Sequence, residues 1–249
     1  TPLDEAEGAI LAHSVKVGTR ALKKGRVLGA ADIAALRAAG RVEVIVARLE
    51  PGDVGENEAA DRIAAILDHP GVSAAKAFTG RANFYAEAAG VCVIDREAID
   101  RFNLIDESIT IATIEPSTVV APKQMIATVK IIPFAVRGEA LDAAVTAIKD
   151  KKRFQVVPFK PHRTALIQTT LPGLKDSILD KTVETTRDRL AEFGSTLDWE
   201  KRCPHDPGAL APIIDEMVKA GAQLVLVAGA SAILDRRDGI PASVTDLGG

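Results

Sequence analysis

The stretch from Asp206 to Val227, Asp-Pro-Gly-Ala-Leu-Ala-Pro-Ile-Ile-Asp-Glu-Met-Val-Lys-Ala-Gly-Ala-Gln-Leu-Val-Leu-Val, decides the fold class. Asp206 is a typical N-cap residue, and Pro207 suits the first helical position. Apolar residues then recur at helical spacing until Gly221 ends the pattern: Leu210, Ile213, Ile214, Met217 and Val218. A short apolar strand, Gln223 to Val227, follows at once. The segment therefore predicts a helix leading into a buried strand.

The same alternation extends toward the N-terminus from this segment. Ala165 to Thr169 predicts a short strand, and Thr196 to Trp199 predicts another. Between them, apolar residues recur on one helix face that Gly194 closes: Leu179, Val183, Thr186, Leu190 and Phe193. Strands that alternate with helices at short spacing are typical of α/β domains. We expect a doubly wound parallel sheet with both faces covered.

Upstream of this pattern the chain predicts a mixed α+β region. Asp32 is expected to cap a short helix that stops at Gly40. Strands are expected at 108–114 and 125–132, where Ile, Thr and Val dominate, with a helix at 139–149. A basic, proline-containing stretch from Lys151 to His162 marks the boundary. The expected domains are therefore residues 1–155 and 160–249.

Composition excludes several classes of function. The chain of 249 residues is 47% hydrophobic and 26% charged, with a net charge of −3 and 4% aromatic residues. It lacks the basic patch and the stacking aromatics of a nucleic-acid binder. Two cysteines do not make a disulfide framework, and Cys203 with His205 and Asp206 lacks a second ligand pair for zinc. With no long apolar run and no leader pattern, we expect no membrane span, no signal peptide and a cytoplasmic location.

Two loops that follow strand ends hold the candidate site residues, because ligands of such sheets bind beyond the carboxyl ends of the strands. In the loop at 228–238, small residues allow close backbone approach, Asp238 is a candidate Mg²⁺ ligand and Arg237 a candidate phosphate partner. The alternative is a capped turn with a surface ion pair. The loop at 169–180 and the helix start after it offer polar side chains for the same pocket: Lys175, Asp176, Ser177, Asp180, Lys181 and Thr182. The alternative there is plain helix capping by Ser177 and Asp180.

These residues carry a resemblance to a known family. From about Thr164 onward the chain resembles the molybdopterin-binding domain shared by molybdopterin adenylyltransferases and molybdotransferases. The matching places are Thr169-Thr170, Asp180-Lys181-Thr182, the strand that ends in Ala228-Gly-Ala-Ser231, and Arg237-Asp-Gly-Ile-Pro241. Ala228 stands where the family has glycine. The first half is more loosely similar to the N-terminal region of molybdotransferase-like proteins, without their Ser-Ala-Met-Asp-Gly-Tyr signature.

The resemblance implies a role in molybdenum cofactor biosynthesis. Thr169, Thr170, Gly229, Ala230 and Ser231 would face the pterin. Arg237 and Lys175 or Lys181 would bind anions, while Asp238, the metal ligand, and Asp180 would be catalytic. The reaction would be adenylyl transfer from ATP or molybdate insertion with Mg²⁺, in a homo-oligomer that works with other cofactor-biosynthesis enzymes.

Two further interpretations stay open at this point. The alternative function is a non-catalytic pterin or nucleotide binding module that delivers cofactor to a partner enzyme. Ala228 favours it, because a methyl group narrows close backbone approach. A separate polar cluster in the first half is expected either to line the substrate cleft or to form turns and caps: Thr79 to Asn83, including Arg81, with Asn103, Asp106 and Glu107.

Overall fold

The structure is a computed structural model that describes residues 1–67, 69–149 and 154–248. The chain forms two compact units, Thr1–Pro158 and Phe159–Gly249. Each unit is described by itself below. Among the described residues, no helix has both the length and the apolar character that crossing a membrane requires.

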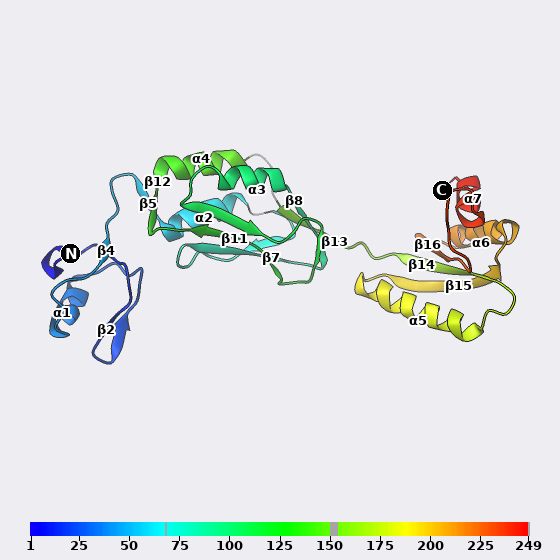
Figure 1. Cartoon of the computed structure of the whole chain (residues 1–249), viewed down its shortest axis with the longest axis horizontal. Coiled ribbons are helices and arrows are strands. Elements are labelled where there is room, and N and C mark those ends of the chain that lie inside the picture. Colours follow the sequence, from blue (N-terminus) through cyan, green and yellow to red (C-terminus); the bar gives the residue numbers. More distant parts are fainter. Residues whose placement is uncertain (68, 150–153, 249) are drawn as a thin grey trace. The chain divides into compact units, whose positions relative to one another are not determined.

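The C-terminal unit is built on the parallel sheet that the sequence predicts. Its elements in chain order are β14 (Arg163–Thr170), α5 (Asp176–Glu192), β15 (Thr196–Pro204), α6 (Pro207–Lys219), β16 (Leu224–Ala228) and α7 (Gly239–Asp246). The strand order is β15-β14-β16, and both pairings are parallel. Helix α5 covers one face, and α6 with α7 covers the other (Figure 1). The chain thus winds in both directions from the central strand β14.

The pleat of β14 distributes its side chains between these two faces. Ala165 and Ile167 belong to the apolar cluster that includes Leu210 and Met217 of α6 and Ile240 of α7. Gln168 points the other way, because its Nε2 donates to the carbonyl of Leu179 in α5. Since side chains alternate along a strand, Thr169 shares the α6/α7 face and Thr170 the α5 face.

Two expectations for this unit need correction. The strand expected at Thr196 to Trp199 continues to Pro204, because the charged residues at 200–202 still pair with β14. The sheet is also less covered than expected, since Leu224 of the edge strand β16 is exposed and the rest of that strand is half-buried. Helix α7 follows the loop at 228–238 and packs Ile240 and Val244 against the apolar cluster.

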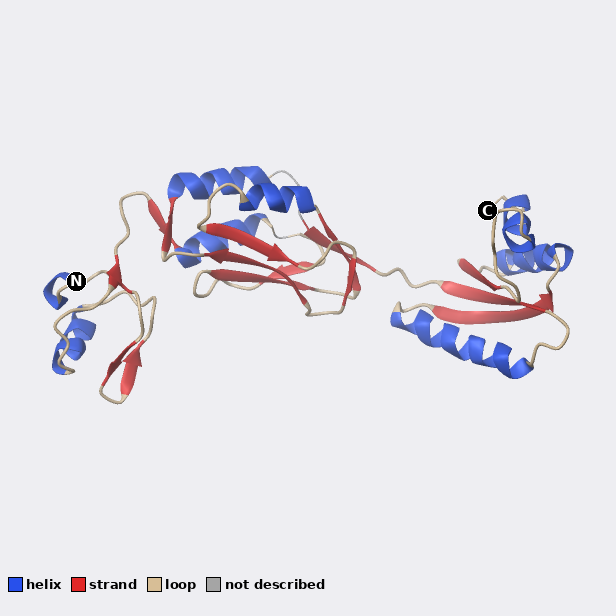
Figure 2. Ribbon diagram, in the orientation of Figure 1, coloured by secondary structure: helices blue, strands red, loops and turns tan. Residues whose placement is uncertain are grey.

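The N-terminal unit contains an antiparallel sheet in the order β6-β7-β11-β9, formed by Val72–Ala74, Arg81–Ala86, Met125–Ile131 and Ile109–Thr113. Helices α2 (Glu56–Ile66) and α3 (Arg96–Asn103) pack on it, and α4 (Gly138–Ile148) packs on both helices (Figures 1 and 2). A second sheet, β10-β8-β13, joins Thr118–Val120, Gly90–Ile94 and Phe154–Pro158. The strands β5 (Asp53–Gly55) and β12 (Ala135–Arg137) pair with each other. This unit confirms the expected mixture of helices and strands.

Residues 1–48 of this unit enclose a small apolar core of their own, which includes Leu11, Leu28 and Leu36. The elements are η1 (Leu3–Glu5), β1 (Ile10–Leu11), β2 (Val15–Val17), β3 (Arg20–Leu22), α1 (Ala30–Ala38) and β4 (Val46–Ala47). The expectation that Asp32 is the N-cap of α1 is wrong, because Asp32 lies in the first turn of that helix. Its carboxylate accepts a bond from the amide of Gly29, which is the N-cap residue.

Several residues of the polar cluster in the first half stabilise local structure. Asn103 donates from Nδ2 to the carbonyl of Ile111 at 2.9 Å and accepts the amide of Ile111 at 2.7 Å. Asp106 accepts from both the amide and the hydroxyl of Ser108, and Asn83 accepts from the hydroxyl of Thr128 at 2.8 Å. These three side chains therefore form turn and strand contacts.

Candidate functional site

The candidate site is a cleft of about 340 Å³ at the carboxyl ends of β14 and β15. It is lined by Thr169, which ends the buried part of β14, by His205 and Asp206 after β15, and by Arg237 before α7. Leu210 and Ile240 form an apolar wall. The chain winds away from β14 to either side, so this is the switch point at which doubly wound sheets bind ligands. Its volume lies within the usual range for small-molecule sites.

Thr169 ties three segments together at the base of the cleft. Its hydroxyl lies 2.8 Å from Nδ1 of His205 and accepts a bond from the amide of Ala230 at 2.9 Å. The amide of His205 in turn donates to the carbonyl of Thr170 at 2.9 Å. The hydroxyl oxygen thus bonds both partners, and the tautomer of the imidazole sets the direction of its bond with Nδ1. The imidazole is therefore held in a fixed place beside the cleft.

Two helices begin at this cleft. Helix α6 starts at Pro207, where the carboxylate of Asp206 accepts the amide of Ala209 at 3.1 Å. Helix α7 starts at Gly239, and both Pro207 and Gly239 line the cavity. A helix N-terminus presents partial positive charge and amide donors, which favour anions. At α6 the Asp206 carboxylate already accepts the Ala209 amide and Pro207 has no N–H, so the start of α7 and the guanidinium-bearing Arg237 are the groups that suit a phosphate.

Asp238 lies beside this cleft and organises the loop before α7. Its Oδ2 accepts the amide of Leu234 and, at 3.2 Å, the amide of Asp235. These backbone bonds, helped by the nearby His205, hold the pKa of Asp238 below its usual value. The described residues contain no group of three or more His, Cys, Asp or Glu side chains that suits a metal ion. Asp238 thus offers Mg²⁺ one carboxylate, and phosphate oxygens and water would have to supply the other ligands.

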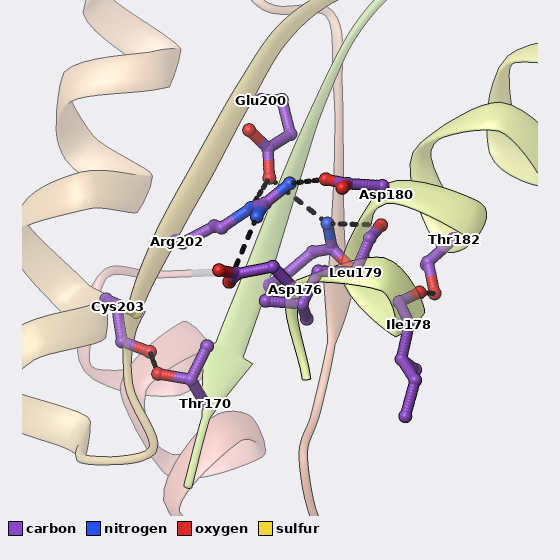
Figure 3. A network of polar contacts seen from close by, with 10 residues as sticks. Thr170, Asp176, Ile178, Leu179, Asp180, Thr182, Glu200, Arg202 and Cys203 are labelled. Carbon is purple, nitrogen blue, oxygen red and sulfur yellow. Dashed lines mark hydrogen bonds and ion pairs between the residues drawn. The ribbon is translucent and has the colours of Figure 1, made fainter. Parts of the chain in front are cut away.

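The acidic residues expected from the first loop lie on the α5 face instead. Arg202 of β15 donates to Glu200 at 2.7 Å and to Asp180 at 2.5 Å, and lies 3.6 Å from Asp176 (Figure 3). Glu200 also accepts from Nε2 of Gln168 at 3.1 Å. The two nearest carboxylates, Glu200 and Asp180, raise the pKa of Arg202. This arginine network joins α5 to the sheet, so Asp176 and Asp180 do not face the cleft.

The other expected site residues lie outside the cavity lining. The hydroxyl of Thr170 donates to the carbonyl of Cys203 at 3.1 Å, and that of Thr182 to the carbonyl of Ile178 at 2.9 Å (Figure 3). Gly229 packs so closely against Ile240 that a Cβ would lie 2.7 Å from its Cδ1. Four residues are exposed and do not belong to the lining of the cleft: Lys175, Ser177, Lys181 and Ser231. Of the expected set, Thr169 and Arg237 line the cleft and Ala230 supports it.

The residues of the β15–α6 loop were missed by the sequence argument. The candidate site residues come from the loops at 169–180 and 228–238, whereas Cys203, His205 and Asp206 are weighed only as a zinc site. The signal was nevertheless present: Asp206-Pro207 marks a helix start, so His205 had to lie between a strand and that start. A histidine in such a place lies at the carboxyl edge of the sheet.

Comparison with known proteins gives one family match. Residues 1–48 match the model of a family described as "Domain of unknown function (DUF8806)". The matched range coincides with the segment that encloses its own small core. A search of curated proteins found no match.

Proposed function

We propose that the C-terminal unit binds molybdopterin through its phosphate at the cleft formed by Thr169, His205, Arg237 and the starts of α6 and α7. The observation that carries the proposal is the convergence of the start of α7 and Arg237 on one cavity at the switch point of the sheet. Such a cavity suits a small molecule with an anionic group. The molybdopterin-binding fold itself is part of the proposal.

Each cleft residue has a distinct part in this binding. Arg237 pairs with the phosphate, and the first-turn amides of α7 donate to its oxygens. Leu210 and Ile240 supply an apolar surface for the planar pterin ring. Thr169 holds His205 and the Ala228–Ser231 turn in place, which fixes the width of the cleft. The pterin is favoured over other phosphorylated ligands by the resemblance of Thr169-Thr170 and Arg237-Asp238 to that family.

Binding without turnover is the form of the proposal that the geometry favours. Both carboxylates expected to be catalytic have internal partners: Asp180 pairs with Arg202, and Asp238 accepts two backbone amides. Mg²⁺, when bound, would supply charge neutralisation at the phosphate, with Asp238 as its protein ligand. We therefore infer a module that holds the pterin, and adenylyl transfer or molybdate insertion is the competing outcome.

The test is equilibrium binding of molybdopterin to the full chain, measured by fluorescence of the oxidised pterin. Arg237→Ala is expected to weaken binding about 10- to 100-fold, because the phosphate loses a charge-assisted hydrogen bond. The matched control is Arg236→Ala, which removes the same charge one residue away from the cavity lining. Equal weakening by both variants would contradict the proposed site, and absence of binding to the unmodified chain would overturn the function.

Two added arms separate the alternatives. Pyrophosphate release from ATP, or molybdate uptake, in the presence of molybdopterin would identify an enzyme in place of a binding module. Displacement of the pterin by ADP at similar concentration would identify a nucleotide site.

A further inference from the structure

A second cavity, of about 290 Å³, lies within the N-terminal unit and plays no part in the proposed pterin site. Its lining includes Lys24, Glu56, Thr79, Arg81 and Lys130. Three cationic side chains and one carboxylate thus share a small space. Neither the family match nor the resemblance assigns anything to it.

The charges in this cavity do not neutralise one another by direct contact. Among the described residues, none of the four charged side chains forms an ion pair within 4.0 Å. Lys24 lies over the ring of Phe134, 5.1 Å from its centre, which fixes its place. Burial raises the pKa of Glu56, and Lys24 and Arg81 offset part of that rise. With one carboxylate for three cations, the cavity keeps a net positive charge.

A strained, tightly held turn places Arg81 at the cavity. Thr79 and Gly80 have φ values of 49° and 70°, and Phe78 and Arg81 exchange backbone hydrogen bonds across them. Positive φ is unfavourable for a β-branched residue such as threonine, and strain of this kind is concentrated at ligand sites. Helix α2 also holds the turn, because the amide of Gly80 donates to Oδ1 of Asn57 at 2.9 Å.

Close packing around Gly80 excludes any larger residue there. A Cβ at Gly80 would lie 2.9 Å from both the carbonyl oxygen of Ile131 and Oε2 of Glu56. The turn, the start of α2 and the end of β11 therefore meet with no room to spare. This packing holds Glu56 against the turn that carries Arg81.

We propose that this cavity binds the phosphate group of a phosphate monoester through Lys24, Arg81 and Lys130. With Glu56 ionised, the four charged side chains sum to +2, which matches a phosphate dianion. The hydroxyl of Thr79 lines the same cavity and supplies a further donor. Glu56 limits the attraction, so that the site releases its ligand, and its position disfavours anions of higher charge.

The experiment is an NMR titration of the full chain, following the amides of Gly80, Arg81 and Ile131, which report on this cavity alone. The probes are inorganic phosphate and ribose 5-phosphate. Saturable shifts with inorganic phosphate identify the phosphate as the recognised group, and tighter binding of the ester shows that the rest of the ligand also makes contact. Absence of saturable shifts at these amides with either probe would overturn the proposal.

Charge variants test the assignment of residues. Arg81→Gln and Lys130→Gln are each expected to weaken binding about fivefold or more, whereas Glu56→Gln is expected to strengthen it several-fold. The matched control is Lys76→Gln, an exposed lysine that does not line the cavity. If Lys76→Gln weakens binding as much as Arg81→Gln, net charge alone explains the titration and the site is rejected.

Discussion

The two faces of the parallel sheet in the C-terminal unit place their polar groups in opposite ways. On the α5 face, Arg202 contacts three carboxylates, and Gln168 bonds to Glu200 and to the backbone of α5. On the α6/α7 face, Arg237 and the start of α7 line a cavity. The first face satisfies its charges internally, and the second leaves donors for a ligand.

This difference explains why acidic residues at a helix start are a weak guide to chemistry. Asp176 and Asp180 are carboxylates at a helix start, as the catalytic interpretation expects, yet both form ion pairs with Arg202. Thr169 is a less reactive residue, but it lies where the chain changes direction. In this unit, the position of a residue relative to the switch point distinguishes cleft residues from structural residues better than its residue type does.

The largest expected effect compares two buried threonines of β14. Thr169→Val removes the hydroxyl that bonds the Ala230 amide and His205, and is expected to lower the free energy of unfolding by about 1–3 kcal/mol. Thr164→Val is the matched control, because the buried Thr164 hydroxyl has no hydrogen-bond partner among the described residues. That variant is expected to be neutral or stabilising. Urea unfolding measures both, and equal losses would contradict the assignment of Thr169.

The next prediction concerns the α5 face. Arg202→Met is expected to lower the urea midpoint of unfolding, because Glu200, Asp180 and Asp176 lose their shared cation. Arg187→Met, a change at an exposed arginine of helix α5, serves as control and is expected to leave the midpoint nearly unchanged. Pterin affinity is expected to be the same in both. A loss of pterin affinity in Arg202→Met alone would contradict the proposed cleft, because the ligand would then bind the α5 face of the sheet.

A smaller effect is expected from Asp238, through its pH dependence. Its pKa is lower in the folded chain, so its ionised form stabilises the fold above the unfolded pKa, and this contribution is lost as the pH falls through the folded pKa. Asp238→Asn is expected to lower the thermal midpoint at pH 7 and to converge with the unmodified chain toward pH 3. A difference that stays constant over this range would contradict the role of the carboxylate.

The smallest expected effect has the opposite sign. Burial raises the pKa of Glu56 in the folded chain, so stability is greatest when this group is protonated and decreases as the pH rises through the folded pKa. Glu56→Gln is therefore expected to raise the thermal midpoint slightly at pH 7, and the gain is expected to vanish near pH 4. Calorimetry at the two pH values checks it, and destabilisation at pH 7 would show that the carboxylate is a net stabiliser.

The elements of the C-terminal unit were predictable because their signals are local. Asp206-Pro207 marks the start of α6, and the apolar stripe after it marks the buried face. The end of β15 was not predictable in this way. Glu200 to Arg202 has the composition of a surface loop, and only the distant residues Asp180 and Gln168 make that strand favourable.

The N-terminal unit shows the same limit more strongly. Strand β7 was seen as a polar cluster, because Arg81 and Asn83 alternate with buried residues whose partners lie more than 40 positions away in β11. The cavity near Glu56 depends on a turn, a helix start and a strand end from separate parts of the chain. The polar cluster at Thr79 to Asn83 indicated a cleft as one alternative, but no local pattern predicts that Lys24, Glu56 and Lys130 lie beside it.

The most direct test of the central claim is an NMR titration of the full chain with molybdopterin. The account predicts the largest amide shifts at His205, Gly239 and Ile240, at the cleft, and small shifts at Ser177 to Thr182 on α5. Shifts concentrated at Ser177 to Thr182 would contradict it, because the ligand would then bind the face whose charges are already paired.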